Sequence, residues 1–210
     1  FDGTILDGEL YENTFLVYDA VMTEGMVIGH KHFLDRLDHM EKVVKGLIGM
    51  KSDRVKVKVK KFHAMCDFGS FMNDYLPTVK ERMDGLVFTP VYEKVLMGTH
   101  ETMFKWKPKE KNTVDFMVKK DQRGIWRLYV QEKGKLYMES EIPPDKVDQL
   151  PLLEEGAILE CQYMMNDVPM WWKPILRRHD KTYPNNRRTF YRTIVNIKED
   201  IQMNEFLKCT

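Results

Sequence analysis

The chain has 210 residues, of which 43% are hydrophobic and 11% aromatic, enough apolar material for one large or two small cores. This composition excludes a chain that is disordered throughout. Its 33 Lys and Arg residues balance 32 Asp and Glu residues, so affinity for an anionic ligand has to come from local clusters of charge. The three cysteines are scattered and form no CxxC pair, which indicates reduced thiols in a soluble, intracellular protein. No apolar run approaches the roughly 20 residues that span a bilayer, so no membrane partner is expected.

The first half of the chain is typical of mixed helix and strand. Apolar side chains recur every three or four positions between residues 30 and 49, which predicts an amphipathic helix that ends at Gly49. A shorter helix is predicted at 70–76, ending before Pro77. Apolar runs predict strands at 4–6, 15–18, 55–59, 86–88 and 103–104, and the lysines that alternate with valines at 55–60 indicate a sheet edge. Residues 1–108 are therefore predicted to form an α+β domain.

The second half has a different character. Short strands are predicted at 113–118, 125–130, 135–138 and 157–163, separated by turns with Gly or Pro. This spacing is typical of a small β-barrel, and it predicts a second domain over residues 109–210. A short helix is predicted at 199–208.

Carboxylates follow or precede several of these strands. Asp7-Gly8-Glu9-Leu10 ends the first strand, Tyr18-Asp19 ends the second, and Asp84-Gly85 precedes a later one. Two carboxylates can hold a hard divalent cation through oxygen ligands. Taken singly, each pattern is more typical of a turn or of core packing than of a site.

Two basic groups complete the set of candidate residues. Lys105-Trp106-Lys107-Pro108 places two lysines on the same side of a predicted strand, where their ammonium groups can receive phosphate oxygens. Arg178-His179-Asp180-Lys181 lies in the predicted barrel and is, by itself, typical of a charged loop.

The order of the motifs is more informative than any one of them. DGEL (7–10), FLVYD (15–19), DGLVF (84–88), FKWKP (104–108), NTVDF (112–116) and RHDK followed by PNN (178–186) resemble the ordered motifs of the covalent nucleotidyltransferases. The resemblance is to the branch of mRNA capping guanylyltransferases, most of all those of large DNA viruses. It implies that residues 1–108 are the C-terminal part of a nucleotidyltransferase domain, and that residues 109–210 form an OB-fold domain with a C-terminal helix.

The resemblance also implies a reaction and its partners. A lysine attacks the α-phosphate of GTP, and the lysine–GMP intermediate passes GMP to the 5′-diphosphate end of RNA to form GpppN, with Mg²⁺ or Mn²⁺ as cofactor. The site residues that it implies are Glu9 near ribose and metal, Tyr18 on guanine, Asp84 at the metal, Lys105 and Lys107 on the α-phosphate, Asp115 beside them, and Arg178, Asp180 and Lys181, which swing onto the β- and γ-phosphates when the domains close.

The family's nucleophile lies in a Lys-x-Asp-Gly motif, which these 210 residues do not contain. We therefore expect an upstream segment to supply the lysine, and this chain alone to form no GMP adduct. Triphosphatase and methyltransferase domains are possible companions in the complete protein. The expected compartment is the nucleus for a cellular protein and the cytoplasm or virion for a viral one.

Two alternatives stay open at this point. An ATP-dependent polynucleotide ligase shares the nucleotidyltransferase fold. A non-catalytic OB-fold module that binds RNA is supported by the basic run 105–111 and by Trp171, Trp172 and Tyr183 as stacking residues.

Overall fold

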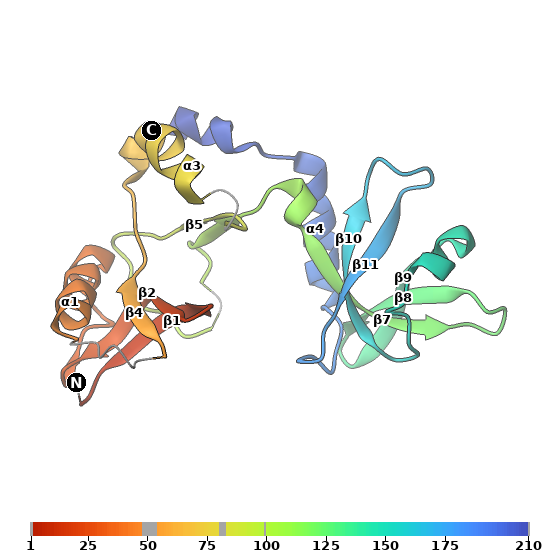
Figure 1. Cartoon of the computed structure of the whole chain (residues 1–210), viewed down its shortest axis with the longest axis horizontal. Coiled ribbons are helices and arrows are strands. Elements are labelled where there is room, and N and C mark those ends of the chain that lie inside the picture. Colours follow the sequence, from red (N-terminus) through yellow and green to blue (C-terminus); the bar gives the residue numbers. More distant parts are fainter. Residues whose placement is uncertain (1, 48–53, 80–82, 99, 210) are drawn as a thin grey trace. The chain divides into compact units, whose positions relative to one another are not determined.

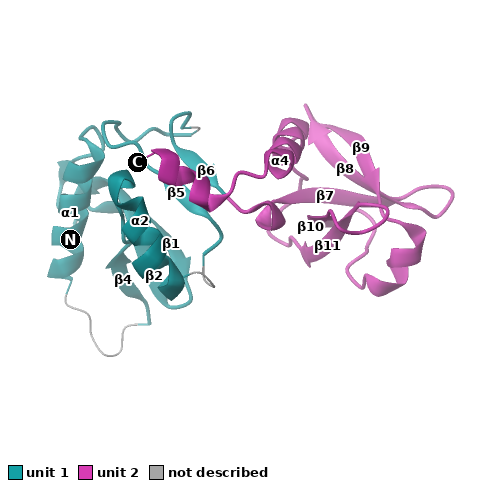
Figure 2. Ribbon diagram, turned by 90° about the horizontal axis from the view of Figure 1, so that it is seen from above, with its two compact units in different colours: residues 1–106, 210 teal, residues 107–209 magenta. Residues whose placement is uncertain are grey.

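The computed structural model of the chain describes residues 2–47, 54–79, 83–98 and 100–209. The chain divides into two compact units between Trp106 and Lys107 (Figure 2). Each unit has a hydrophobic core of its own. The predicted end of the first helix at Gly49 lies outside the described residues.

The first unit is built on a small mixed sheet. β1 (Ile5–Tyr11) pairs antiparallel with the long strand β2 (Thr14–Thr23), and β3 (Met26–Val27) pairs antiparallel with the end of β2. β4 (Lys56–Val59) runs parallel to the beginning of β2 (Figure 1). Among the described residues β4 pairs with β2 alone, which fits the edge position predicted from its lysines.

The predicted amphipathic helix is confirmed as α1 (Phe33–Gly46). It packs against β2 and β4. Phe33 and Met40 from its apolar face join Val17 and Ala20 of β2 in the buried core. One face of the sheet is therefore covered.

A second helical segment runs further than expected. α2 (Phe68–Ser70) continues through a π-helical turn at Phe71–Tyr75 into α3 (Leu76–Val79). The predicted stop before Pro77 is wrong. Proline has no amide hydrogen, so it cannot donate the backbone hydrogen bond of an α-helix. The wider π-helical turn just before Pro77 already interrupts the α-helical hydrogen-bond pattern, so the helix continues through this proline. The predicted strands near 86 and 104 are confirmed as the antiparallel pair β5 (Leu86–Phe88) and β6 (Phe104–Trp106).

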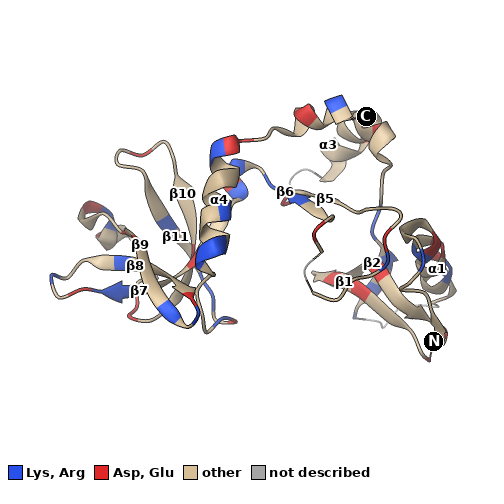
Figure 3. Ribbon diagram, turned by 180° about the vertical axis from the view of Figure 1, so that it is seen from behind, with Lys and Arg blue, Asp and Glu red and all other residues tan. Residues whose placement is uncertain are grey.

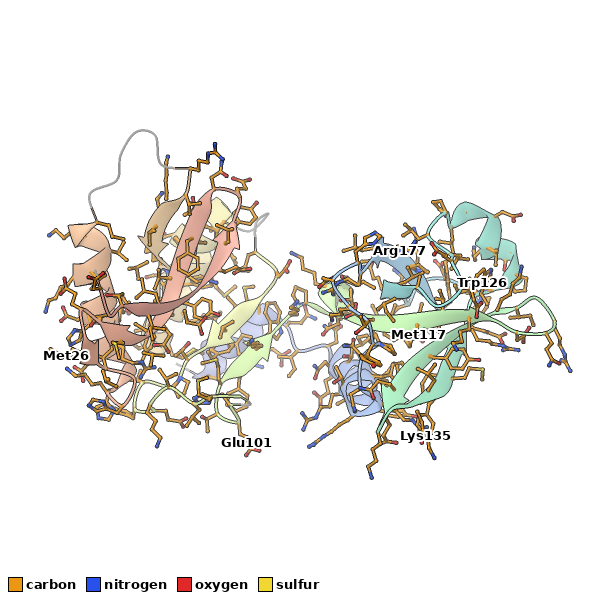
Figure 4. The ribbon with its side chains drawn as sticks, turned by 90° about the horizontal axis from the view of Figure 1, so that it is seen from below. Met26, Glu101, Met117, Trp126, Lys135 and Arg177 are labelled. Carbon is orange, nitrogen blue, oxygen red and sulfur yellow. The ribbon has the colours of Figure 1, made fainter. Side chains whose placement is uncertain are left out.

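The second unit is an antiparallel sheet in the order β11-β10-β7-β8-β9. Its strands are β7 (Thr113–Lys120), β8 (Trp126–Glu132), β9 (Lys135–Glu141), β10 (Ile158–Met164) and β11 (Trp171–Arg177). Within the described part of the chain no ladder joins the outer strands β9 and β11, so the unit predicted as a small β-barrel is a sheet that does not close. Figure 4 shows Met117 on the central strand β7 and Trp126 at the beginning of β8.

β11 is a strand that the sequence did not predict. Pro174 interrupts its apolar run, and a proline inside a run argues against a central strand. The structure accommodates Pro174 because β11 lies at the edge of the sheet, and because the ladder to β10 is irregular between Glu160 and Cys161, next to the Pro174 pairing.

α4 (Arg187–Glu199) corrects the prediction of a helix at 199–208. The helix begins 12 residues earlier, where the side chain of Asn186 accepts a hydrogen bond from the backbone of Arg188 and caps the first turn. Residues Met203–Cys209 form a 3₁₀-helix instead. Phe190 and Ile197 of α4 enter the core of the sheet.

The aromatic core of the second unit contradicts one prediction from the sequence. Trp171 and Trp172 are only 5% and 3% exposed. The Phe116 ring lies edge-on to Trp172 and Phe190, at centroid distances of 5.4 and 5.7 Å. These tryptophans hold the core together, so the prediction that they stack on RNA bases is wrong.

Candidate functional site

In the first unit, four polar side chains form a cluster that includes Tyr18. The Tyr18 hydroxyl donates a hydrogen bond of 3.0 Å to Asp7 Oδ1 on β1. Lys60, which follows β4, places its ammonium group 3.8 Å from Glu9 Oε2 and 6.0 Å from the centre of the Tyr18 ring. Asp7, Glu9, Tyr18 and Lys60 are called the tyrosine cluster below. It gathers groups from β1, from β2 and from the residue that follows β4.

The tyrosine cluster brings together two of the predicted residues, Glu9 and Tyr18. Partial burial, followed by the hydrogen bond to Asp7, raises the pKa of the Tyr18 phenol. The phenol is therefore neutral near pH 7 and keeps its donor role. Sequence reasoning missed Lys60, because an alternating Val-Lys strand indicates only a solvated face.

Gly8 of the DGEL motif allows β1 and β2 to approach closely. A Cβ atom at this position would lie 2.6 Å from the Phe15 ring and 2.7 Å from the Leu16 carbonyl oxygen. Any larger residue would push β1 away from β2. This glycine therefore fixes the distance between the strand of Glu9 and the strand of Tyr18.

A buried ion pair anchors the strand next to Tyr18. Arg36 on α1 holds Asp19 through two hydrogen bonds, Nε to Oδ1 at 2.7 Å and Nη2 to Oδ2 at 2.9 Å. Its Nη1 group donates to the carbonyl oxygens of Lys31 and Glu93. Arg36 is only 2% exposed. The pair ties β2, α1 and the segment around Glu93 together directly beside Tyr18.

Three further predicted residues lie near the β5–β6 pair. Asp84 is exposed and precedes β5, and Lys105 is exposed on β6, opposite Val87 of β5. Lys107 follows the end of β6 and is the first residue of the second unit. The structure therefore places Asp84 and Lys105 at paired strands, while Lys107 lies beyond the strand that was expected to carry both lysines.

In the second unit the remaining predicted residues converge on Asp115. Arg178 Nη1 lies 3.2 Å from Asp115 Oδ1, and the ammonium group of Lys181 hydrogen-bonds Asp115 Oδ2. Arg178 also binds Asp180 through its Nε and Nη2 groups, at 3.1 and 2.9 Å. The Asp115 side chain is 6% exposed. With Glu160, described next, these residues are called the Asp115 cluster: Asp115, Glu160, Arg178, Asp180 and Lys181.

The pairing of β7 with β10 positions this cluster. Asp115 of β7 is paired with Glu160 of β10, so their carboxylates lie on neighbouring strands. Thr113 donates a hydrogen bond of 2.8 Å to Glu160 Oε1, and Glu160 Oε2 lies 3.5 Å from Arg178 Nη1. Sequence reasoning missed Glu160 and Thr113, because only the pairing of β7 with β10 brings them to Arg178.

Asn185 explains the polar stretch that follows RHDK. Its backbone N–H donates to the Asp115 carbonyl oxygen, and its side-chain oxygen accepts from the Asp115 N–H, both at 2.8 Å. Its carbonyl oxygen accepts from the backbone of Gln131 on β8 at 3.0 Å. Asn185 thus fixes the backbone of Asp115 at the centre of the cluster.

Two side chains of the Asp115 cluster, Arg178 and Asp180, are ionised near neutral pH. The hydrogen bond to Asp180, together with the nearby carboxylates, raises the pKa of the Arg178 guanidinium. The same hydrogen bond is the main cause that lowers the pKa of Asp180 to about 2. Arg178, with the ammonium group of Lys181 beside it, can therefore offer charge-assisted hydrogen bonds to an anion such as phosphate.

Within the described ranges, no group of three or more His, Cys, Asp or Glu side chains gathers in a way that could hold a metal ion. Neither does any helix of these ranges have the length and apolar character needed to cross a membrane.

The described part of the chain is a mixed α/β protein, with a tyrosine beside carboxylates on one sheet and two cations that contact a buried carboxylate on the other. Residues 1–109 match the family described as mRNA capping enzyme, catalytic domain. The chain therefore belongs to the mRNA capping enzyme family, a class of nucleotidyltransferases.

Curated relatives extend the similarity beyond the matched domain. The chain is 28% identical to the mRNA-capping enzyme of Mus musculus over 207 residues, which cover 89% of this chain and 34% of the mouse protein. It is 26% identical to the mRNA-capping enzyme subunit alpha of Schizosaccharomyces pombe, over 98% of this chain and 59% of that protein. The Danio rerio mRNA-capping enzyme is 29% identical over 87% of the chain. The chain thus spans about a third of the animal relatives and three fifths of the yeast subunit.

Proposed function

We propose that the complete protein is an mRNA 5′-guanylyltransferase that transfers GMP from GTP, through a lysine–GMP intermediate, to the 5′-diphosphate end of RNA, forming GpppN. Family membership supports this activity. The observation that carries it at residue level is the Asp115 cluster, where two cations from one short loop are held side by side on a buried carboxylate. The family match does not favour a ligase or a non-catalytic RNA-binding module.

The proposed roles follow from the chemistry of each group. The half-buried Tyr18 ring offers a flat surface for guanine, and Glu9 offers an acceptor for ribose hydroxyls. Lys105 and Lys107 neutralise the α-phosphate, while Arg178 and Lys181 neutralise the β- and γ-phosphates of the leaving pyrophosphate. Asp180 holds Arg178 in place through its two hydrogen bonds.

The proposed cofactor is a divalent cation. Mg²⁺ usually takes one or two protein carboxylates together with substrate phosphates and water, so a closed protein cage is not required. Glu9 and Asp84 are the carboxylates proposed to hold Mg²⁺ or Mn²⁺, which would offset negative charge on the α-phosphate.

The proposal extends to the rest of the protein. The first unit corresponds to the C-terminal part of the nucleotidyltransferase domain, and the second, from about residue 109, to an OB-fold, a five-stranded and partly open barrel. The nucleophilic lysine is proposed to come from a segment outside these 210 residues. Triphosphatase and methyltransferase domains, and a source among large DNA viruses, stay predictions, as does the compartment.

Adduct formation tests this function. The complete protein is incubated with α-labelled GTP or ATP and then denatured, and the label retained on the protein is measured. We expect GTP to label the protein and ATP not to. Lys107→Ala and Lys181→Ala should each lower the labelling rate by about 100-fold, because each removes a cation that faces developing charge.

Lys173→Ala is the matched control, since Lys173 is an exposed lysine on β11 outside both clusters. Its labelling rate should equal that of the unaltered protein. Labelling by ATP would contradict the proposed GTP-dependent function. Unchanged rates in Lys107→Ala and Lys181→Ala would exclude the proposed site. The 210-residue chain alone should retain no label.

A further inference from the structure

The Asp115 cluster contains more acid than base. Three carboxylates, those of Asp115, Glu160 and Asp180, surround the two cations Arg178 and Lys181. With every group ionised the cluster is therefore negative by one charge, although its cations are proposed to bind phosphate. A phosphate oxygen has to compete with carboxylates that already occupy the same donors.

The three carboxylates are held differently. Asp180 belongs to the same loop as Arg178 and can move with it, and its side chain is 66% exposed. Asp115 and Glu160 are fixed on paired strands of the sheet. The Thr113 hydroxyl holds Glu160 Oε1, which leaves Oε2 directed at Arg178 Nη1, the same group that contacts Asp115.

We propose that Glu160, anchored by Thr113, is a positioning residue that holds Arg178 at the sheet and is exchanged for phosphate oxygens when a triphosphate binds. This inference rests on the proposed role of Arg178 and Lys181 in binding phosphate. Glu160 has no part in the predicted motifs, and its position is set by the pairing of β7 with β10.

The proposed exchange predicts whether a substitution of Glu160 strengthens or weakens anion binding. Glu160→Gln keeps the size of the side chain and an acceptor for Thr113, but it removes the charge that competes with phosphate. The interaction between two unit charges about 4 Å apart in water changes a binding constant about five-fold. Removing the charge of Glu160 should therefore strengthen anion binding, whereas a residue that only supports the fold would weaken binding when replaced.

Calorimetric titration of the 210-residue chain with inorganic tripolyphosphate measures this effect. We expect Glu160→Gln to bind about five-fold more tightly than the unaltered chain at low salt, and the gain to shrink as salt screens the charges. Glu154→Gln is the matched control. Glu154 pairs with Arg177, the residue before Arg178, so the control removes the same charge from the adjacent ion pair.

The double variant Arg178→Ala/Lys181→Ala separates the two hypotheses. If it binds tripolyphosphate as well as the unaltered chain, the proposed phosphate site is wrong and this inference falls with it. If it loses binding while Glu160→Gln shows no gain, or a gain equal to that of Glu154→Gln, only the role of Glu160 is overturned. Should Glu160→Gln fail to fold by circular dichroism, Glu160→Asp decides, because the shorter side chain withdraws from Arg178: a gain supports the exchange, and no gain overturns it.

Discussion

Cys161 differs from the other two cysteines because it lies beside the Asp115 cluster, next to Glu160 on β10. It is fully buried, while Cys66 and Cys209 are exposed. Burial, and to a lesser degree the charges of Asp115 and Glu160, raise the pKa of the Cys161 thiol well above its ordinary value. Because the thiolate is the nucleophile, this thiol should be inert in the folded chain.

We therefore expect iodoacetamide at pH 8 to alkylate Cys66 and Cys209 in the native chain, and Cys161 only after unfolding in guanidinium chloride. Peptide mass spectrometry identifies the labelled positions. Native labelling of Cys161 at the rate of Cys66 would contradict the burial of β10.

The Asp19–Arg36 pair connects a helix, a strand and a loop of the first unit. Its two side chains are 14% and 3% exposed, and Arg36 also binds two backbone carbonyls. Breaking a buried pair leaves an uncompensated charge, which costs far more than the net contribution of the intact pair.

Arg36→Ala should lower the free energy of unfolding of the first unit by about 3 kcal/mol. The measurement follows the unfolding transition of this unit in urea. Lys42→Ala breaks the exposed pair with Asp38 on the same helix, at side-chain exposures of 72% and 58%. That control should cost less than about 0.5 kcal/mol. Equal effects of the two substitutions would show that Asp19 is well solvated without Arg36.

The two units have separate cores, one between α1 and β2 and the other between α4 and the antiparallel sheet. Lys and Arg residues recur along α4 (Figure 3). Apolar residues of the same helix enter the second core. Each unit therefore has its own cooperative source of stability.

A fragment of residues 107–209 should fold alone and unfold in one cooperative transition by near-ultraviolet circular dichroism. Phe116→Ala should destabilise it by about 4 kcal/mol, because the ring is fully buried against Trp172 and Phe190. In the 210-residue chain the same substitution should leave the transition of the first unit unchanged. A fragment without a cooperative transition would show that the second core depends on the first unit.

Features that depend on local pattern were predictable from the amino-acid sequence. Three- and four-residue spacing located α1, alternation located β4, and the order of six short motifs identified the family. The helix and strand signals are local because periodicity is a property of neighbouring residues. The order of the motifs extends over residues 7–186, and it identified the family through resemblance. Reasoning from local pattern was wrong at Pro77, where a π-helical turn removes the usual penalty for a proline inside a helix.

Strand pairing determines which charged side chains contact one another. Asp115 and Arg178 are 63 residues apart, and Thr113 and Glu160 are 47 apart, so no short window of sequence contains either pair. Lys60 reaches Tyr18 because β4 lies parallel to β2, and Glu160 reaches Arg178 because β10 pairs with β7. Strand pairing over long separations sets these neighbours, and electrostatic interactions weaken with distance, so the partners of a charged residue follow from the fold and not from its motif.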